Sequence, residues 1–367
     1  MLNRVFVCGY PSEIGGANTE LWHTVKLWRQ SGLGVTLIPT WDAPAVWRAR
    51  LDALGCRTVE VSKVQGTRFK VQGSNPTHLE PWTLNLEPSS IPGLPGSIVV
   101  SLCNTKFLAV AERFRAMGCR IVWLGCMNWL FPAERLHYCK HGCFDRHVFQ
   151  SQYQHDQLVP QLRRFGYRDE QGAVIRGAFD SAEFPLRPLP HAPGEIFTIG
   201  RMSRSAADKF SPRTWAIYAR VPHPIRARVL GWSTEVRARL GPPPRWANCL
   251  PAAAQRPQDF LATLGALVHA GGPATENWPR VGLEAMAAGV PVVADNRGGW
   301  REMIRHGETG YLCDSEDQFA YYTARLAYDE AHRLEIVRQA RQALETQLAH
   351  PQTIWAQWQQ LLAGLDT

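Results

Sequence analysis

A chain of 367 residues is long for a single hydrophobic core, so its length predicts two domains. An apolar content of 45% and a charged content of 20% are ordinary for a globular protein, which excludes a disordered or low-complexity chain. The net charge is +8, and residues 1–188 hold 21 Lys and Arg against 15 Asp and Glu. This basic surface is compatible with a polyanionic partner or an anionic membrane, although a solvated arginine-rich surface is the commoner explanation.

The chain begins with an apolar, strand-like run and lacks the basic lead and long apolar stretch of a signal peptide. No run approaches the ~18 consecutive apolar residues that a spanning helix needs. We therefore expect a cytoplasmic protein without a transmembrane segment. The nine cysteines are dispersed and odd in number, which favours reduced thiols over a disulfide framework.

Short apolar runs rich in Val and Ile alternate with helix-length segments along the whole chain. This alternation is typical of parallel sheets that are covered by helices on both faces. The sequence therefore predicts an α/β fold with two sheets. The expected strands are residues 4–8, 35–38, 58–61, 97–102, 120–124, 147–151 and 173–176 in the first half, and 195–200, 228–231, 266–270 and 290–294 in the second.

The segment FPLRPLPHAPGE, at residues 184–195, separates the two halves. Its four prolines and one glycine prevent regular structure, so we interpret it as a linker. A last helix is expected at residues 353–365, where Ile, Trp and Leu side chains form one stripe. Its opposite face lacks the basic residues of a membrane-surface helix, which favours docking on protein. Two α/β units facing each other would form a cleft beyond the carboxyl ends of their strands.

One local cluster of potential metal ligands consists of His137, Cys139, His141, Cys143 and His147. Alternating Cys and His side chains can bind zinc. However, the spacing matches no finger pattern and no second cysteine pair lies nearby. We prefer a partly buried helix with solvated histidines, and metal binding stays open as an alternative.

The stretch TENWPRVGLEAMAAGVPVVADNRGG, at residues 275–299, predicts a loop, a helix and a buried strand. The loop follows the strand expected at residues 266–270. Pro279 suits the first turn of the helix, and Gly289 ends that helix after residue 288.

The start of this helix is a candidate anion site. Arg280, Val281 and Gly282 would present unpaired backbone N–H groups, and Gly282 would let a ligand approach closely. Glu276 lies before this turn and Glu284 lies within the helix. A carboxylate can accept hydrogen bonds from two vicinal hydroxyls. Carboxylates on both sides of a phosphate site fit a nucleotide sugar, which joins a ribose, a diphosphate and a hexose.

An amphipathic helix with a solvated glutamate would explain Glu284 alone, but not the glycine pairs at residues 271–272 and 298–299. The two glutamates, followed by AMAAGVPVVADNRGGWREMIRHGETGYL, resemble the donor-binding signature of retaining, GT4-like GT-B glycosyltransferases, the glycosyl transferases group 1. Three further segments resemble the family in the expected order: GYPSEIGGANTEL, RGAFDSAEFP and TIGRMSRSAADKF.

The resemblance implies two Rossmann-like domains that face each other across a cleft. Residues 1–188 would form the acceptor-side domain and residues 189–350 the nucleotide-sugar domain. Residues 351–367 would form a helix that crosses back to pack on the first domain. The implied activity is transfer of a hexose with retention of configuration, from a nucleotide diphosphate sugar, in particular a uridine diphosphate sugar, without a metal.

The resemblance also implies roles for individual residues. Glu284 would hold the ribose hydroxyls, and Glu276 would contact the transferred sugar. Arg201 and Lys209 would neutralise the diphosphate as its bond to the sugar breaks. Two surface cations are the alternative interpretation, but their place directly after a strand favours the diphosphate role. Arg280, Val281 and Gly282 are carried over as the backbone anion site.

In the first domain, Gly15 and Gly16 would let a loop close over the phosphates. The family often has a histidine near the reacting sugar, whereas the corresponding strands here end in SLCNTK and WLGCMNW, offering Asn104 or Asn128. Neither asparagine can act as a base. The resemblance implies that the departing phosphate takes that role, and we carry Asn128 forward as a catalytic-site candidate. The spacing from Arg201 to Lys209 is longer than usual in the family, so Arg204 is an alternative to Lys209.

The acceptor has to be predicted from the basic first half. Lys63, Arg68 and Lys70 surround Phe69 in VSKVQGTRFKVQG, a pattern that suits a phosphate backbone with accessible bases. The Trp-containing segment NWLFP could hold an unstacked base or a sugar ring. We place DNA that carries hydroxymethylated bases slightly ahead of an envelope lipid or polysaccharide, which are the commoner acceptors of the family. No recognisable nucleic-acid module supports DNA.

Two other functional classes stay open. A GT-B sugar-nucleotide epimerase would keep the nucleotide site but needs acid and base groups near the sugar, and the first-domain loops offer few. A noncatalytic nucleotide-sugar binding protein would keep Glu284 without turnover. Donor hydrolysis in the absence of an acceptor separates a binder from a catalyst.

Overall fold

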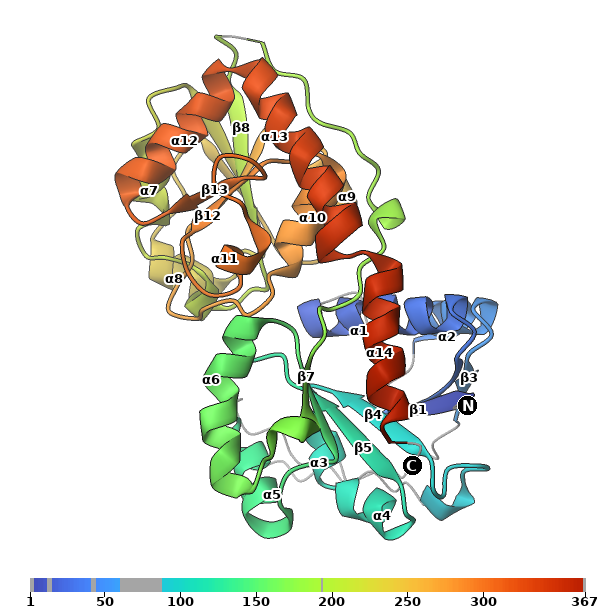
Figure 1. The fold of residues 1–367 in the computed structure, drawn as a ribbon. Helices are drawn as coiled ribbons and strands as arrows, with labels where there is room; N and C mark the ends of the chain where they lie inside the picture. Colours follow the sequence, from blue (N-terminus) through green and yellow to red (C-terminus); the bar gives the residue numbers. More distant parts are fainter. Residues whose placement is uncertain (1–2, 12–14, 41–43, 60–87, 193, 366–367) are drawn as a thin grey trace.

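The computed structural model describes residues 3–11, 15–40, 44–59, 88–192 and 194–365. These residues form two α/β domains, each built around a parallel sheet with helices on both faces (Figure 1). The predicted fold class is therefore confirmed. The first sheet is completed before residue 175, and the second begins at residue 197.

The first sheet has the strand order β3-β2-β1-β4-β5-β6-β7, and every pairing is parallel. Its chain order reverses between β1 and β4, which is the point where open α/β sheets bind ligands. The strands are β1 (Arg4–Cys8), β2 (Gly34–Ile38), β3 (Arg57–Thr58), β4 (Ile98–Leu102), β5 (Arg120–Leu124), β6 (Arg146–Phe149) and β7 (Gly172–Val174). The helices are α1 (Gly16–Gln30), α2 (Ala45–Ala53), α3 (Thr105–Leu108), α4 (Ala111–Ala116), α5 (Pro132–His141) and α6 (Gln152–Leu162).

The second sheet has the order β10-β9-β8-β11-β12-β13 and is also parallel. Its strands are β8 (Phe197–Met202), β9 (Ile225–Leu230), β10 (Ala247–Leu250), β11 (Ala266–His269), β12 (Val292–Asp295) and β13 (Tyr311–Cys313). The helices from here to the C-terminus are α7 (Thr214–Ala219), α8 (Thr234–Leu240), α9 (Pro257–Leu261), α10 (Arg280–Ala288), α11 (Trp300–Met303), α12 (Glu316–Tyr328), α13 (Glu330–Ala343) and α14 (Pro351–Ala363). Short helical turns are η1 (Pro88–Ser90), η2 (Arg163–Phe165), η3 (Asp169–Gln171), η4 (Ser181–Glu183), η5 (Ala207–Lys209) and η6 (Leu344–Leu348).

Strand β1 shows why the interior of a central strand in the first sheet is apolar. Side chains of a strand alternate between the two faces of the sheet. Val5 and Val7 pack in the cluster that includes α1 and α14, whereas Phe6 and Cys8 pack in the cluster that includes α3, α4 and α5. Since both faces are covered, each position of the strand's interior has to be apolar.

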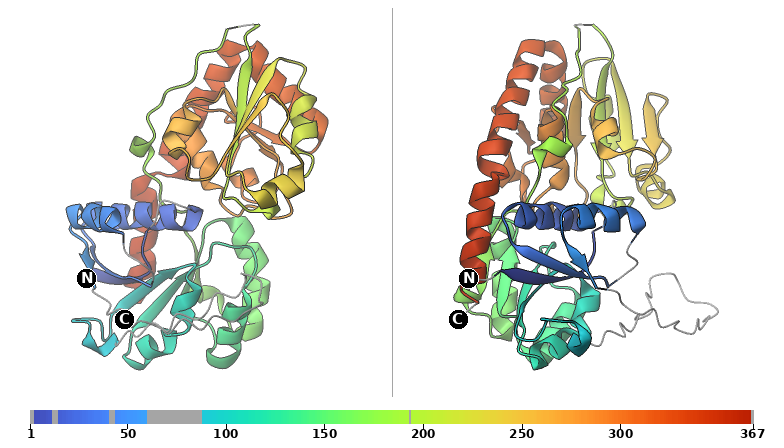
Figure 2. Two further views of the ribbon diagram at one scale, coloured as in Figure 1. Left: turned by 180° about the vertical axis from the view of Figure 1, so that it is seen from behind. Right: turned by 90° about the vertical axis from the view of Figure 1, so that its right-hand side faces the viewer.

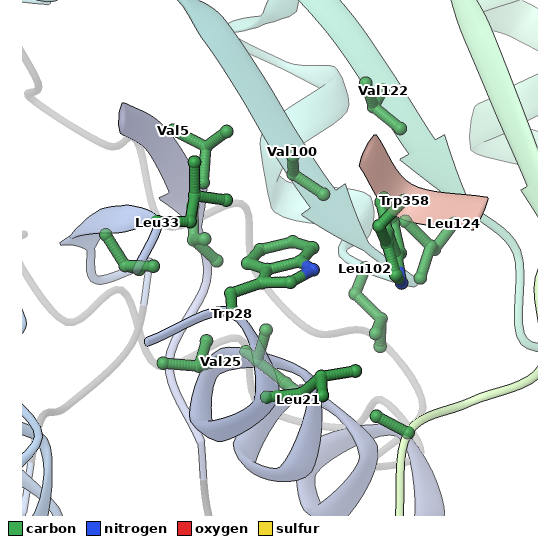
Figure 3. Close-up of a cluster of buried hydrophobic side chains, with 14 of the residues drawn as sticks. Val5, Leu21, Val25, Trp28, Leu33, Val100, Leu102, Val122, Leu124 and Trp358 are labelled. Atoms are coloured by element: carbon green, nitrogen blue, oxygen red, sulfur yellow. The ribbon is translucent and has the colours of Figure 1, made fainter. Parts of the chain in front are cut away.

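The last helix, α14, returns to the first domain, as expected from its apolar stripe. Figure 2 shows α13 and α14 running along one side of both domains. Trp358 of α14 meets Trp28 of α1 edge to face, with ring centroids 4.8 Å apart. Figure 3 shows both indoles among the side chains of β1, β4 and β5. The C-terminal segment is therefore part of the first domain's hydrophobic core.

The structure differs from the sequence prediction at two strands. β10 and β13 were not expected, and they form the two edges of the second sheet. β10 is covered incompletely and its Asn248 is exposed, so it lacks a continuous apolar run. β13 is apolar but only three residues long, which is too short for a clear strand pattern. Of the expected strand at residues 58–61, the part from residue 60 onward lies outside the described residues.

The histidines of the Cys and His cluster are not all solvated as expected. His137 of α5 is buried, with its ring stacked on Phe144 at a centroid distance of 4.7 Å. His147 of β6 is also buried, and burial lowers its pKa to about 3. Within the described ranges, no group of three or more His, Cys, Asp or Glu side chains is arranged to hold a metal ion. In the same ranges, no helix combines the length and the apolar character needed to cross a membrane.

Candidate functional site

The candidate site lies where the two domains meet. The segment between β11 and α10 brings residues 275–280 of the second domain against the first domain. On the first-domain side lie the start of α1, the loop after β5 and the residue that follows β6. We call residues 275–280 the donor turn. Figure 1 shows α1 on the side of the first domain that faces the second, and one end of α6 near the second domain.

The glycine pair Gly298–Gly299 fixes the backbone of the donor turn. The Gly299 N–H donates to the Glu276 carbonyl at 2.8 Å. A Cβ atom on Gly298 would lie 2.4 Å from the Glu276 carbonyl oxygen, and one on Gly299 would lie 1.8 Å from that of Asn277. Only glycine allows the two backbone segments to approach this closely. The shape of the donor turn therefore requires glycine at both positions.

The other glycine pair, Gly271–Gly272, ties the end of β11 to its neighbours. The Gly271 N–H donates to the Asp295 carboxylate at 2.5 Å, and the Gly272 N–H donates to the Lys209 carbonyl at 3.1 Å. The segment that carries Lys209 is thereby held beside the donor turn.

Lys209 and Glu276 are in direct contact. The Lys209 Nζ atom lies 3.0 Å from Glu276 Oε1, and the two side chains are 13% and 20% exposed. The turn η5 ends at Lys209 and takes up the longer spacing from Arg201. Arg204, the alternative cation, instead forms an exposed pair with Asp208 at 3.2 Å. Of the two candidate cations, the structure therefore places Lys209 beside the donor turn.

Arg201 is buried behind this pair. Its guanidinium donates to the Ala270 carbonyl at 2.6 Å and to the Lys209 carbonyl, and it stacks on the Phe210 ring at 4.5 Å. Burial lowers the pKa of Arg201, while the nearby carboxylates of Asp295 and Glu276 oppose that effect. Its Nε atom has no hydrogen-bond partner. The side chain thus positions the Lys209 segment while adding positive charge to the site.

Glu284 lies one turn into α10 and is 9% exposed. Its carboxylate forms no hydrogen bond with any of the residues that the structure describes. Burial raises the pKa of Glu284 to about 7, and the Arg280 cation opposes part of that rise. A buried carboxylate without a protein partner is available to accept hydrogen bonds from a ligand.

Gly282 has a packing role that the sequence did not indicate. Its N–H donates to the Pro279 carbonyl at 2.9 Å, and a Cβ atom there would lie 2.5 Å from Met303 Sδ and 2.7 Å from the Trp300 ring. The glycine is therefore needed for packing of α10 against α11, and its role in admitting a ligand stays a prediction. The amides of Arg280 and Val281 remain in the first turn of α10, where a helix has no carbonyls of its own for them.

Arg280 reaches across to the first domain. Its guanidinium donates to the Ala178 carbonyl at 3.1 Å and to Thr19 Oγ1 at 3.2 Å, and it lies 3.9 Å from Glu20 Oε2. Gly16 begins α1 beside it, where a Cβ atom would lie 3.7 Å from Arg280 Cδ.

Gly15 adopts a φ of +97°, which favours glycine, and caps α1. The described end of the predicted glycine loop therefore faces the second domain, while residues 12–14 lie outside the described residues.

The two candidate asparagines have different surroundings. Asn128 donates to the Thr275 carbonyl at 2.8 Å, and its buried Oδ1 atom has no hydrogen-bond partner in the part of the chain that the structure describes. It therefore touches the residue that precedes Glu276. Asn104 instead donates to the Cys8 carbonyl and to Thr40 Oγ1 within the first domain.

Three residues at the site were not anticipated from the sequence. Asn277 donates to Gln150 Oε1 at 2.5 Å, and Gln150 in turn donates to the Glu20 carboxylate. All three are buried. Glu20 could have been noticed in the sequence because it lies one helical turn after the glycines at residues 15–16. The contact of Gln150 with Asn277 joins distant parts of the chain, so no local pattern predicts it.

A separate contact joins the domains through a side chain that does not contact the donor turn. The Glu302 carboxylate of α11 accepts hydrogen bonds from the backbone N–H groups of Gln152 at 3.0 Å and Tyr153 at 2.7 Å. These are the first residues of α6, so a carboxylate of one domain caps a helix of the other.

Comparisons with known proteins find a family match within the second domain. Residues 255–343 match the family described as Glycosyl transferases group 1. N-acetyl-alpha-D-glucosaminyl L-malate synthase from Bacillus anthracis is 39% identical over 74 residues. That match spans 20% of this chain and 19% of the length of the relative.

Several solved structures share the fold over nearly the whole chain. HepE from Anabaena, in complex with UDP and glucose, has a TM-score of 0.68 at 16% identity and covers 98% of this chain and 99% of its own. Sucrose-phosphate synthase from Thermosynechococcus elongatus has a TM-score of 0.70 at 15% identity, with 99% of each chain covered. A mutant of TarM from S. aureus, in complex with Fondaparinux, alpha-GlcNAc-glycerol and UDP, has a TM-score of 0.70 at 10% identity and covers 98% of this chain and 99% of its own.

These matches confirm the resemblance seen in the sequence. The chain has the GT-B fold, and the group 1 match includes the donor turn, α10 and the glycine pair at residues 298–299.

Proposed function

We propose that this GT-B chain, with its group 1 segment, is a glycosyltransferase that uses a nucleotide diphosphate sugar as donor. The observation that carries the proposal is the pair of carboxylates around the donor turn: Glu276 in contact with Lys209, and Glu284 buried without a protein partner. Ribose hydroxyls would donate hydrogen bonds to the Glu284 carboxylate. Without them, burial of this carboxylate costs free energy that no hydrogen bond offsets.

The donor is proposed to be a uridine diphosphate sugar, with the diphosphate beside Lys209 and the first amides of α10. A helix N-terminus and a fixed cation both stabilise an anion. When the diphosphate binds, Lys209 would turn from Glu276 to a phosphate oxygen, and Glu276 would then be free to accept hydrogen bonds from the sugar. The HepE and TarM structures that contain UDP support this choice of nucleotide.

The reaction is proposed to transfer a hexose with retention of configuration and without a metal. As the bond between the sugar and the diphosphate breaks, negative charge develops on the leaving phosphate. Lys209 and the buried charge of Arg201 would stabilise it. The leaving phosphate would take the proton of the acceptor hydroxyl, as the resemblance to the family implies. Asn128 would orient the sugar through its unpartnered Oδ1 atom, since an amide cannot act as a base.

The acceptor would enter from the first domain. The basic segment behind the DNA prediction, with Lys63, Arg68, Phe69 and Lys70, lies outside the described residues, so hydroxymethylated DNA stays a prediction from the sequence. Saccharide-type acceptors have support from the names of matched proteins, which include sucrose-phosphate synthase and a lipopolysaccharide outer core galactosyltransferase.

A transfer assay tests the function directly. The protein would be incubated with UDP-sugars and a panel of acceptors: hydroxymethylcytosine DNA, lipid-linked saccharides and free glycans. Mass spectrometry would detect a gain of one hexose, and release of UDP would report turnover. Donor hydrolysis without transfer would support a glycosyltransferase that lacks its acceptor. Donor binding without hydrolysis would favour a noncatalytic binder, and formation of an isomeric nucleotide sugar would favour an epimerase.

A further inference from the structure

Two first-domain side chains, Gln150 and Glu20, contact both ends of the segment that leads into α10. Gln150 Oε1 accepts a hydrogen bond from Asn277 at 2.5 Å, and Gln150 Nε2 donates to Glu20. Glu20 Oε2 lies 3.9 Å from the Arg280 guanidinium. Gln150 and Glu20 of the first domain therefore connect two residues of the second domain, Asn277 and Arg280.

Every member of this chain of contacts is buried: Gln150 is 3% exposed, Glu20 2%, Asn277 7% and Arg280 6%. Buried polar groups are costly unless they are paired, so these contacts hold only one arrangement of the two domains. Glu20 Oε1 and Arg280 Nη2 lack hydrogen-bond partners among the described residues, which leaves hydrogen-bonding capacity at the site.

The first-domain pair is itself rigidly held. The Gln150 backbone N–H donates to Gln154 Oε1 at 2.6 Å, and Gln154 is fixed by the Gly125 and Met127 carbonyls. Glu20 packs against Gly177, where a Cβ atom would lie 2.6 Å from its carboxyl carbon. Because Gln150 and Glu20 are held in place within the first domain, they can position the donor turn of the second domain.

We propose that Gln150 and Glu20 are positioning residues of the donor site. They hold the donor turn in place from the first domain. This also fixes the positions of Glu276 and of Arg280, which lies beside Glu284. The inference rests on the proposed function, because the donor turn is taken to bind the nucleotide sugar. It adds that the first domain shapes the donor site before any acceptor is present.

The test is the kinetics of donor hydrolysis, measured by UDP release without acceptor. In Gln150→Ala, we expect kcat/KM for the UDP-sugar to fall at least tenfold, because Asn277 and Glu20 both lose a partner. Most of the loss should lie in KM, since bound donor can itself hold the turn in place. Glu20→Gln keeps an acceptor oxygen for Gln150 but removes the charge facing Arg280, and it should lower kcat/KM as well.

A cycle of variants separates positioning from general destabilisation. Asn277→Ala should cause a similar loss, and Gln150→Ala should add less than threefold in that background. Glu302→Gln is the matched control: it weakens a contact between the domains that does not involve the donor turn and should leave kcat/KM within threefold of wild type. Thermal unfolding of each variant would identify one that fails to fold, and the remaining variants would then carry the test.

The possible results lead to distinct conclusions. Unchanged kinetics in both Gln150→Ala and Glu20→Gln would overturn the inference, as would effects of Gln150→Ala and Asn277→Ala that simply multiply. An equal loss in Glu302→Gln would show that domain contact in general, rather than this pair, sets the donor site. If the wild-type protein neither binds UDP nor hydrolyses a nucleotide sugar, the proposed function fails and the inference fails with it.

Discussion

Replacing Glu284 with glutamine is expected to raise stability and weaken donor binding. Burial raises the pKa of this carboxyl from 4.5 to about 7, against the opposing effect of Arg280. Between these two pH values the folded protein holds a proton that the unfolded chain has released, so the free energy of unfolding decreases as pH rises through this window. Each pKa unit corresponds to about 1.4 kcal/mol, which makes the cost of the ionised carboxylate at pH 8 roughly 3 kcal/mol.

Glutamine has nearly the same shape and carries no charge. Glu284→Gln should therefore be more stable than wild type at pH 8 by up to about 3 kcal/mol, with little difference near pH 4.5. Donor binding at pH 8 should change in the opposite direction. The loss of charge-assisted hydrogen bonds to ribose costs about 1.5–3 kcal/mol, which is roughly a ten- to hundredfold weaker Kd.

Both effects can be measured on one pair of proteins. Thermal unfolding without ligand, at pH 5 and pH 8, gives the stability difference, and titration calorimetry with UDP at pH 8 gives the affinity difference. In wild type, UDP affinity should rise with pH through about 7 and then level off, because an ionised carboxylate accepts both hydroxyls. Equal pH dependence of unfolding in the two proteins would refute the reasoning, since Glu284 would then titrate as it does in the unfolded chain.

Three further changes test other parts of the structure. Lys209→Met should lower kcat for donor hydrolysis at least tenfold while changing stability by no more than about 1 kcal/mol, because its ion pair with Glu276 is partly exposed; a large loss of stability with normal kcat would contradict its role. Gly299→Ala forces the donor turn to move and should lower the free energy of unfolding by about 1–3 kcal/mol and abolish UDP binding, as seen by calorimetry. Trp358→Ala removes the indole that packs on Trp28 and should lower the free energy of unfolding, measured with a chemical denaturant, by about 3–5 kcal/mol. The folded variant should keep its UDP affinity. A decrease below about 1 kcal/mol would show that α14 is not part of the core.

Local patterns account for much of the fold. Strands β1 and β5 begin and end at the residues expected from their apolar runs, because strands covered on both faces are apolar along their whole length. The helix α10 ends at Gly289 with a φ of +84°, as its glycine predicts. β10 escaped prediction because it has an exposed Asn248 and no continuous apolar run, and β13 because its apolar run has only three residues.

The candidate site is only partly accessible from the sequence. A family motif names Glu276, Lys209 and Glu284, but it does not show that Lys209 pairs with Glu276 before the donor binds. The packing role of Gly282 could not be predicted because its neighbours Trp300 and Met303 come from a later helix.

The contacts of Gln150 could not be predicted from local sequence patterns for a similar reason. Its partners Glu20 and Asn277 are both more than 100 residues away in the chain. Only the folded arrangement of the two domains reveals that a neutral side chain after β6 supports the turn of another domain.

Binding of UDP to the wild-type protein and to Glu284→Gln, measured by titration calorimetry at pH 8, tests the donor site most directly. GDP and ADP serve as comparison ligands in the same experiment. The proposed site predicts that wild type binds UDP with one site per chain and that the variant binds it at least tenfold more weakly. Absence of UDP binding in wild type, or equal affinity in the two proteins, would contradict the assignment of the donor turn and α10 as a site for uridine diphosphate sugars.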